Sequence, residues 1–198
     1  SARSTYISTR TIERRSGCKV KLPDNMPSGT QRPSGGPLEG RCFLSVLDFE
    51  PGDLEHSLLL SAALKRDRTL GKEAPTAAAL QGTYVALLFE KPSLRTRVSF
   101  EVGVKQMGGT CIFLSNSEVG LGIREPESDV AKVLDRLVDC IVARVFSHSS
   151  LEKLAANTDL PVINALSDKG HPCQAMGDCL TIFENKGTLS NLKLAFIG

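Results

Sequence analysis

The sequence lacks the patterns that mark several common classes of protein. Its six cysteines form no C-x-x-C pair and no Cys/His spacing that suits zinc, so we expect reduced thiols, a reducing compartment and no metal site. No apolar run approaches the roughly 20 residues needed to span a bilayer, and no segment resembles a secretory signal. Neither G-x-x-x-x-G-K-[ST] nor a strand-linked G-x-G-x-x-G occurs, which argues against a nucleotide-binding module.

Charge and composition set residues 1–40 apart. The formal net charge of +2 is too small to favour nucleic acid or an acidic membrane surface as a partner. Residues 1–40 hold seven Lys/Arg and three Asp/Glu, and ten of the 18 residues 23–40 are Pro, Gly or Ser. We therefore predict a disordered basic tail over residues 1–40. The arginines of this tail stand among Ser and Thr, which also fits an organelle transit peptide. The sequence lacks an initiator Met, which fits a fragment or an upstream stretch that is not natural coding sequence.

From residue 41 onward, apolar runs alternate with helix-type patterns. The predicted strands cover residues 82–89, 110–114, 140–146 and 161–165. The predicted helices cover residues 53–68, 94–107, 126–138, 150–157 and 173–186. This β-α-β-α order predicts an α/β fold, with a mostly parallel sheet and helices on both faces. In such sheets ligands gather beyond the carboxyl ends of the strands.

Some residues define these elements more closely. Asp53 is predicted to cap the first helix, and a polar loop is expected over residues 115–125. Five apolar residues after Pro126 are expected to share one helix face: Val130, Val133, Leu134, Leu137 and Val138. A final strand over residues 192–197 breaks off at Gly198. We therefore expect one domain over residues 41–186, and residues 187–198 to begin a second domain that is missing from a truncated chain.

The junction after the first predicted strand concentrates groups that bind anions. Ser93 and Thr96 stand with Arg95 and Arg97 at a predicted helix N-terminus, where unpaired N–H groups and the helix dipole favour an anion. Positions 95 and 97 differ by about 200° around a helix. We therefore predict Arg95 as a phosphate ligand and Arg97 as the surface partner of Glu101. The alternative is that Ser93 is only a helix cap and both arginines are solvated.

Two further strand ends carry polar groups. Arg144 lies in an apolar strand, where an unpaired charge is costly; the alternative is an edge-strand arginine that reaches water or an ion pair. Pro172 suits a first helical turn, so His171 lies near the cap and Gln174 one turn in. An imidazole and an amide there could donate to a carbonyl oxygen and accept from an amine. Taken alone, His171 could also be solvated or capping, and His148 is interpreted in that way.

Three segments together resemble a known family. FEKPSLRTRVSFE, VARVF and NALSDKGHPCQAMGDCLTI are similar, in order and spacing, to the amino-terminal half of the aspartate/ornithine carbamoyltransferases, and most similar to the ornithine-specific enzymes. The resemblance runs from about Phe43 to Gly198. It implies a carbamoyl-phosphate-binding domain of an enzyme that transfers a carbamoyl group to the side-chain amine of ornithine, giving citrulline and phosphate without a cofactor.

The resemblance also implies the site residues. Those that bind carbamoyl phosphate would be Ser93, Leu94, Arg95, Thr96, Arg144, His171 and Gln174, with Arg95, Arg144 and His171 catalytic. Leu94 replaces a more common Thr, but its backbone can still donate. Gly120 replaces a frequent Gln or His in a loop that resembles the family's mobile loop. That loop reaches an active site shared between the subunits of a homotrimer.

The function expected on this basis has several alternatives. The acceptor could instead be acetylornithine, putrescine or aspartate, or the chain could be a non-catalytic anion-binding or trimer-forming module. Because the family's amino-acid-binding segments lie beyond Gly198, we expect this fragment to be inactive alone. The expected partners are carbamoyl phosphate, an amine-bearing amino acid and two further copies of the chain, with no nucleic acid and no membrane. The expected location is the cytoplasm, or a mitochondrion or plastid if residues 1–40 are a transit peptide.

Overall fold

The computed structural model describes residues 9–13, 19–23, 38 and 40–195. Its strands are β1 (Thr9–Glu13), β2 (Lys19–Pro23), β3 (Tyr84–Phe89), β4 (Thr110–Ser115), β5 (Cys140–Arg144) and β6 (Val162–Leu166). Its α-helices are α1 (Pro51–Asp67), α2 (Leu94–Gln106), α3 (Asn116–Val119), α4 (Glu127–Leu134), α5 (His148–Ala156) and α6 (Pro172–Lys186). Two 3₁₀ segments, η1 (Val46–Asp48) and η2 (Arg68–Glu73), flank α1.

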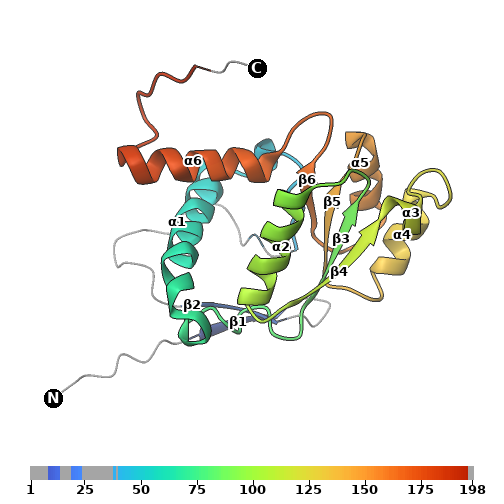
Figure 1. The fold of residues 1–198 in the computed structure, drawn as a ribbon, viewed down its shortest axis with the longest axis horizontal. Coiled ribbons are helices and arrows are strands. Elements are labelled where there is room, and N and C mark those ends of the chain that lie inside the picture. The colour runs from blue at the N-terminus through green and yellow to red at the C-terminus, as the bar shows by residue number, and fades with distance from the viewer. Residues whose placement is uncertain (1–8, 14–18, 24–37, 39, 196–198) are drawn as a thin grey trace.

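The central sheet has four parallel strands in the order β4-β3-β5-β6 (Figure 1). Phe89, at the end of β3, lies opposite both Ser115 of β4 and Arg144 of β5. Arg144 is in turn opposite Leu166 of β6. Since all four strands run in one direction, their carboxyl ends meet at one edge of the sheet. The predicted α/β fold with a mostly parallel sheet is confirmed.

Helices cover both faces of this sheet. Successive residues of β3 alternate between two apolar clusters because side chains of a strand point to opposite faces in turn. Val85 and Leu87 lie in the cluster that contains Val104 of α2, whereas Ala86 and Leu88 lie in the other. The second cluster is completed by α4 and α5, through Val130, Leu134, Leu151 and Leu154. In Figure 1, α2 lies on the side of the sheet toward α1 and α6, and α4 and α5 lie on the other side.

The helices α1 and α6 pack against each other, away from α4 and α5 (Figure 1). An ion pair of 2.6 Å joins Lys65 Nζ to Glu184 Oε2 across this contact. The prediction that Asp53 caps α1 is wrong. Pro51 occupies the first helical position, because its fixed φ suits a helix start, and this moves the cap upstream. Asp53 lies instead in the first turn, where it is buried and accepts from Arg41 at 3.1 Å.

The predicted apolar face of the helix after Pro126 is correct only in part. Val130, Leu134 and Val138 are buried, but Val133 is 54% exposed and Leu137 is 65% exposed. The helix ends at Leu134, so Leu137 lies in a following turn and is not held on the helix face. Val133 faces away because it lies about 60° from Val130 around the helix, at the margin of the buried stripe.

Three segments differ from the sequence prediction. Residues 1–40 were expected to be disordered, yet β1 and β2 form an antiparallel pair, and the β-branched residues at positions 9, 11, 12 and 20 favour extended structure. The loop predicted at residues 115–125 contains the short helix α3, which Ser115 and Glu118 begin with a capping box. The strand predicted at residues 192–197 is absent from its described part, residues 192–195. The transit peptide and the domain boundaries stay predictions, and most of residues 1–40 and residues 196–198 lie outside the described residues.

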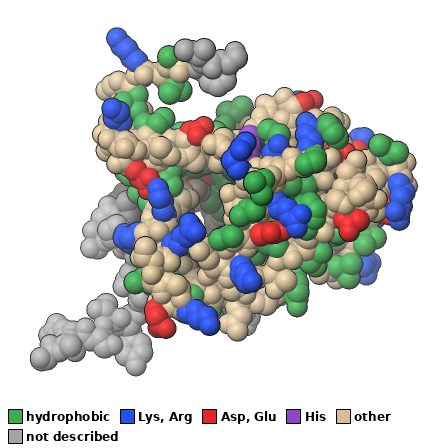
Figure 2. All heavy atoms as spheres, in the orientation of Figure 1, with side chains coloured by type: hydrophobic (Ala, Val, Ile, Leu, Met, Phe, Trp, Pro, Cys, Tyr) green, Lys and Arg blue, Asp and Glu red, His purple; other side chains and the backbone are tan. Residues whose placement is uncertain are grey.

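The surface carries no strong charge of one sign on the side shown in Figure 2. Lys and Arg side chains are scattered among acidic and apolar ones there. This agrees with the small formal net charge of +2. In the described part of the chain, we find no helix that combines the length and the apolar character required to cross a membrane.

Candidate functional site

The N-terminus of α2 follows the end of β3 and begins at the predicted junction. Ser93 has extended backbone geometry (φ −157°, ψ 108°), and its Oγ accepts from the N–H of Thr96 at 3.3 Å. Ser93 therefore caps α2, which the sequence left open as the alternative to a role in binding phosphate. The remaining N–H groups of a first helical turn have no acceptor within the helix, and the helix dipole adds partial positive charge. This end of α2 is thus suited to bind an anion.

The two arginines of this turn have different surroundings. Arg97 Nε donates to Glu101 Oε1 at 2.8 Å, which confirms the predicted surface pair. The guanidinium of Arg97 also lies 3.6 Å from the ring centroid of Phe113 on β4, a cation–π contact that the sequence did not reveal. Arg95 is exposed and forms no ion pair with another described residue. Arg95 is therefore the guanidinium that remains available to a ligand.

Arg144 reaches the α2 N-terminus from the end of β5. Its Nη1 lies 3.4 Å from Thr96 Oγ1, a long hydrogen bond. Its Nε is buried and has no hydrogen-bond partner among the described residues. A buried guanidinium N–H without an acceptor is costly, so this atom indicates an acceptor that a ligand would supply.

His171 stands at the N-cap of α6, just before Pro172. Its Nδ1 is also buried without a hydrogen-bond partner in the described part of the chain. Burial lowers the pKa of His171 below its ordinary value, the positive charge of Arg144 lowers that pKa further, and Asp178 opposes both effects. The imidazole is therefore neutral at neutral pH and lies within the electrostatic reach of Arg144.

The side chain of one predicted ligand, Gln174, does not point into this group. The side chain of Gln174 is exposed and donates from Nε2 to Asp178 Oδ1 at 2.9 Å, one helical turn further on. Leu94 is 79% exposed, so only its backbone can contribute to an anion site. The structure thus brings together Ser93, Thr96, Arg144 and His171, but it leaves the Gln174 side chain turned away.

Glu90 is a residue at this edge that sequence reasoning missed. Its backbone N–H donates to the carbonyl of Arg144 at 2.8 Å, and its Oε2 accepts from the N–H of Phe146 at 2.7 Å. Lys91 Nζ lies 4.6 Å from the ring centroid of Phe146. These contacts fix the end of β5 against the end of β3. The only signal in the sequence was an acidic residue directly after a buried strand.

A cleft of about 480 Å³ opens beside the α2 N-terminus, between Ser93 and the start of α3. Asn116 lines this cleft, and its Oδ1 is buried without a hydrogen-bond partner among the described residues. Gly120 ends α3 with φ +63°, and a Cβ there would lie 2.7 Å from Cβ of Arg124. A side chain at position 120 would therefore require this loop to shift.

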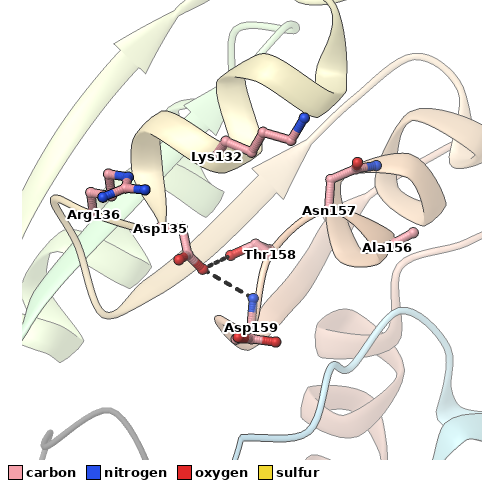
Figure 3. A pocket seen from close by; sticks show the side chains of 7 residues that line it. All are labelled: Lys132, Asp135, Arg136, Ala156, Asn157, Thr158 and Asp159. Carbon is pink, nitrogen blue, oxygen red and sulfur yellow. Dashed lines mark hydrogen bonds between the residues drawn. The ribbon is translucent and has the colours of Figure 1, made fainter.

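A second hollow, of about 410 Å³, lies between α4 and the connection from α5 to β6 (Figure 3). Asp135 accepts from Thr158 Oγ1 at 2.5 Å and from the N–H of Asp159 at 3.0 Å. These bonds join two elements, and the hollow contains none of the predicted site residues. Within the described residues, no group of three or more His, Cys, Asp or Glu side chains could hold a metal ion.

Comparison with known proteins identifies the family of this chain. Residues 41–184 match the family described as aspartate/ornithine carbamoyltransferase, carbamoyl-P binding domain. An ornithine carbamoyltransferase of Anoxybacillus flavithermus is 45% identical over 161 residues, which are 81% of this chain and 50% of that protein.

Solved structures agree with this match. The crystal structure of ornithine carbamoyltransferase from Thermus thermophilus has a TM-score of 0.69 at 46% identity, and the match covers 75% of this chain and 50% of that chain. A variant of N-acetyl-L-ornithine transcarbamylase solved with carbamyl phosphate and N-succinyl-L-norvaline has a TM-score of 0.64 at 31% identity. That match covers 75% of this chain and 49% of the transcarbamylase chain. The chain spans about half the length of these relatives. It belongs to the aspartate/ornithine carbamoyltransferase family and matches the carbamoyl-phosphate-binding domain of that family.

Proposed function

We propose that the complete protein transfers the carbamoyl group of carbamoyl phosphate to the side-chain amine of ornithine, giving citrulline and phosphate. The observation that carries this proposal is the meeting of Thr96, Arg144 and His171 at one edge of the sheet, where two buried nitrogens have no partner among the described residues. Relatives that share 45% of aligned residues are named ornithine carbamoyltransferase, which supports ornithine as the acceptor.

The phosphate group would bind at the N-terminus of α2. Ser93 caps that end of the helix, Thr96 lies in the first turn, and backbone N–H groups of a first turn have no acceptor within the helix. Arg95 is exposed at the same turn and would add a planar, charged donor. In the reaction this positive charge would stabilise phosphate as it leaves.

The carbamoyl group would lie against Arg144 and His171. Attack of the amine nitrogen on the carbonyl carbon places negative charge on the carbonyl oxygen, and donors fixed in advance stabilise that charge more than the ground state. The guanidinium of Arg144 and the hydroxyl of Thr96 are suitable donors, and a neutral imidazole at His171 can donate without a proton transfer. Gln174 could hold the carbamoyl amino group only after its side chain leaves Asp178.

The reaction balances without a metal or an organic cofactor. A C–N bond forms, the bond from the carbonyl carbon to the phosphate oxygen breaks, and the proton lost by the amine passes to the departing phosphate. Because phosphate can accept this proton, His171 need not act as a general base. Holding the two reactants close together in the reactive orientation supplies much of the remaining rate enhancement.

We also propose a homotrimer with shared active sites and a cytoplasmic location, with a mitochondrial or plastid location as the alternative. Exposed apolar side chains support the assembly: Leu94 and Val98 lie on α2, and Ile123 is 88% exposed in the loop that follows α3. Five free cysteines among the described residues fit a reducing compartment. Sedimentation of the complete protein measures the number of subunits, and a monomer would contradict the trimer.

A panel of acceptors tests the proposed reaction on the complete protein. Ornithine should give a kcat/KM far above those of acetylornithine, putrescine and aspartate, measured as release of phosphate and formation of the carbamoylated amine. A higher value with another acceptor would replace ornithine while leaving carbamoyl transfer intact. No turnover with any of the four would favour a non-catalytic anion-binding module.

A further inference from the structure

A polar cluster, in which His148 and Ser167 are buried and Asp168 is exposed, joins the start of α5 to the loop between β6 and α6. His148, the first residue of α5, is 8% exposed, so its interpretation from the sequence as a solvated or capping histidine is wrong. Its Nδ1 lies 2.8 Å from Oγ of Ser167, which is also buried. Its backbone N–H donates to Asp168 Oδ1 at 2.6 Å.

Asp168 caps α5 from outside the helix. The N-cap residue Ser147 makes no capping hydrogen bond, and its Oγ lies 2.8 Å from Oγ of Ser149 instead. The carboxylate of Asp168 therefore supplies the acceptor for the first N–H of α5, at the positive end of the helix dipole. A charge-assisted bond of this kind is stronger than one between neutral groups.

Two further hydrogen bonds hold the end of this loop that precedes α6. The Ser167 N–H donates to the carbonyl of Gly170 at 3.0 Å, and Asn164 Nδ2 donates to that carbonyl at 3.3 Å. Asn164 is almost fully buried. Gly170 directly precedes His171, so the two bonds to its carbonyl hold the backbone one residue before the imidazole.

The cluster lies between two residues of the proposed site. His148 follows Arg144 by four residues, and His171 follows Asp168 by three. We propose that Asp168, together with His148 and Ser167, is a positioning group that fixes the His171 loop against the strand end carrying Arg144. It would thereby control binding of the carbamoyl group and leave phosphate binding at α2 unaffected. This inference rests on the proposed function, because it assigns the ligand of Arg144 and His171.

The test compares Asp168→Ala and Asp168→Asn with the unchanged chain in two measurements. The first is calorimetric titration with carbamoyl phosphate and, separately, with inorganic phosphate. Asp168→Ala should weaken carbamoyl phosphate binding about tenfold, because small displacements of binding groups are costly, and should leave phosphate affinity within about twofold. Asp168→Asn keeps an acceptor oxygen and should recover part of the lost affinity.

The second measurement follows the imidazole of His171 by NMR titration. If the loop moves, His171 leaves its buried place beside Arg144, and its pKa should rise toward the ordinary value of 6.5. Neither ligand is needed for this readout. If the unchanged chain fails to bind carbamoyl phosphate, the proposed function fails, and the titration still decides whether Asp168 positions His171.

Asp135→Ala is the matched control. Like Asp168, Asp135 is a carboxylate that accepts from a backbone N–H of another element; it also accepts from the Thr158 hydroxyl, in the hollow of Figure 3. Its loss should lower the melting temperature but change neither the His171 pKa nor carbamoyl phosphate affinity. Equal effects of Asp168→Ala and Asp135→Ala on both readouts, or an unchanged His171 pKa in Asp168→Ala, would overturn the proposal and leave a purely structural role.

Discussion

Single residues of the site are distinguished by their neighbours more than by their chemical type. Arg95 and Arg97 stand two positions apart, yet one is exposed and the other is held by Glu101 and Phe113. The spacing around a helix predicted this division. The cation–π contact with Phe113 could not be predicted, because it depends on how β4 lies beside α2.

We expect Arg95→Ala to weaken phosphate and carbamoyl phosphate binding about tenfold or more, since a hydrogen bond to a charged group contributes roughly 1.5–3 kcal/mol. Arg97→Ala should leave affinity nearly unchanged but lower the free energy of unfolding by about 1 kcal/mol, because it loses the contact with Phe113. Calorimetry and chemical denaturation measure the two effects. Equal losses of affinity in the two variants would contradict the division of roles.

His171 should titrate below its ordinary pKa of 6.5. Arg144→Gln removes a nearby positive charge and should raise this pKa, whereas Asp178→Asn removes the opposing negative charge and should lower it. Between the folded and unfolded pKa values the folded chain binds fewer protons than the unfolded chain. The stability contributed by this group is therefore complete above pH 6.5 and is lost as the pH falls. NMR titration of the three proteins checks the order, and an Arg144→Gln pKa below that of the unchanged chain would contradict it.

At the scale of elements, the sequence predicted the alternation of strands and helices and missed the contacts between them. Buried runs such as Val85–Phe89 have a clear pattern, and Ser93 has a local one. The bond from the Phe146 N–H to Glu90 joins residues 56 positions apart, and no local pattern encodes it. The same holds for Asp168 and His148. The residues of the candidate site could thus be named from the sequence, and their roles stay predictions, whereas the residues that hold them in place could not be named.

The cap of α2 should contribute to the stability of that helix. Ser93→Ala removes the acceptor for the Thr96 N–H and should lower the free energy of unfolding by about 1 kcal/mol. Ser99→Ala is the control, because the Ser99 hydroxyl only donates to the carbonyl of Arg95 within the same helix. Denaturant unfolding should show little change for Ser99→Ala. A loss as large as that of Ser93→Ala would argue against a special role for the cap.

Gly120 should tolerate a side chain worse than Gly40, although both have positive φ. Gly120→Ala places a Cβ 2.7 Å from Cβ of Arg124, in addition to the backbone cost at φ +63°. Gly40 has φ +71° but nothing within 4 Å of such a Cβ, so Gly40→Ala isolates the backbone cost of about 1–2 kcal/mol. The steric contact should add roughly 1–3 kcal/mol at Gly120. Thermal unfolding of both variants measures the difference, and equal losses would show that the loop adjusts freely.

At the scale of the whole molecule, the described chain contains the groups proposed to bind one substrate. It spans about half the length of the relatives it matches. The proposed phosphate ligands and the pair of Arg144 and His171 all lie within the family match at residues 41–184. The relatives have as much sequence again, which is where we expect the acceptor site. Binding and turnover should therefore separate experimentally.

The 198-residue chain alone should bind inorganic phosphate and carbamoyl phosphate weakly and form negligible citrulline from ornithine. The physical reason is that the rate of a two-substrate reaction depends on holding both reactants in register, which a chain with one binding site cannot do. Calorimetry measures the binding, and a colorimetric citrulline assay with the complete protein as the positive control measures the turnover. Arg144→Ala in the short chain should abolish carbamoyl phosphate binding. Robust citrulline formation by the short chain would show that residues 1–198 already contain an acceptor site.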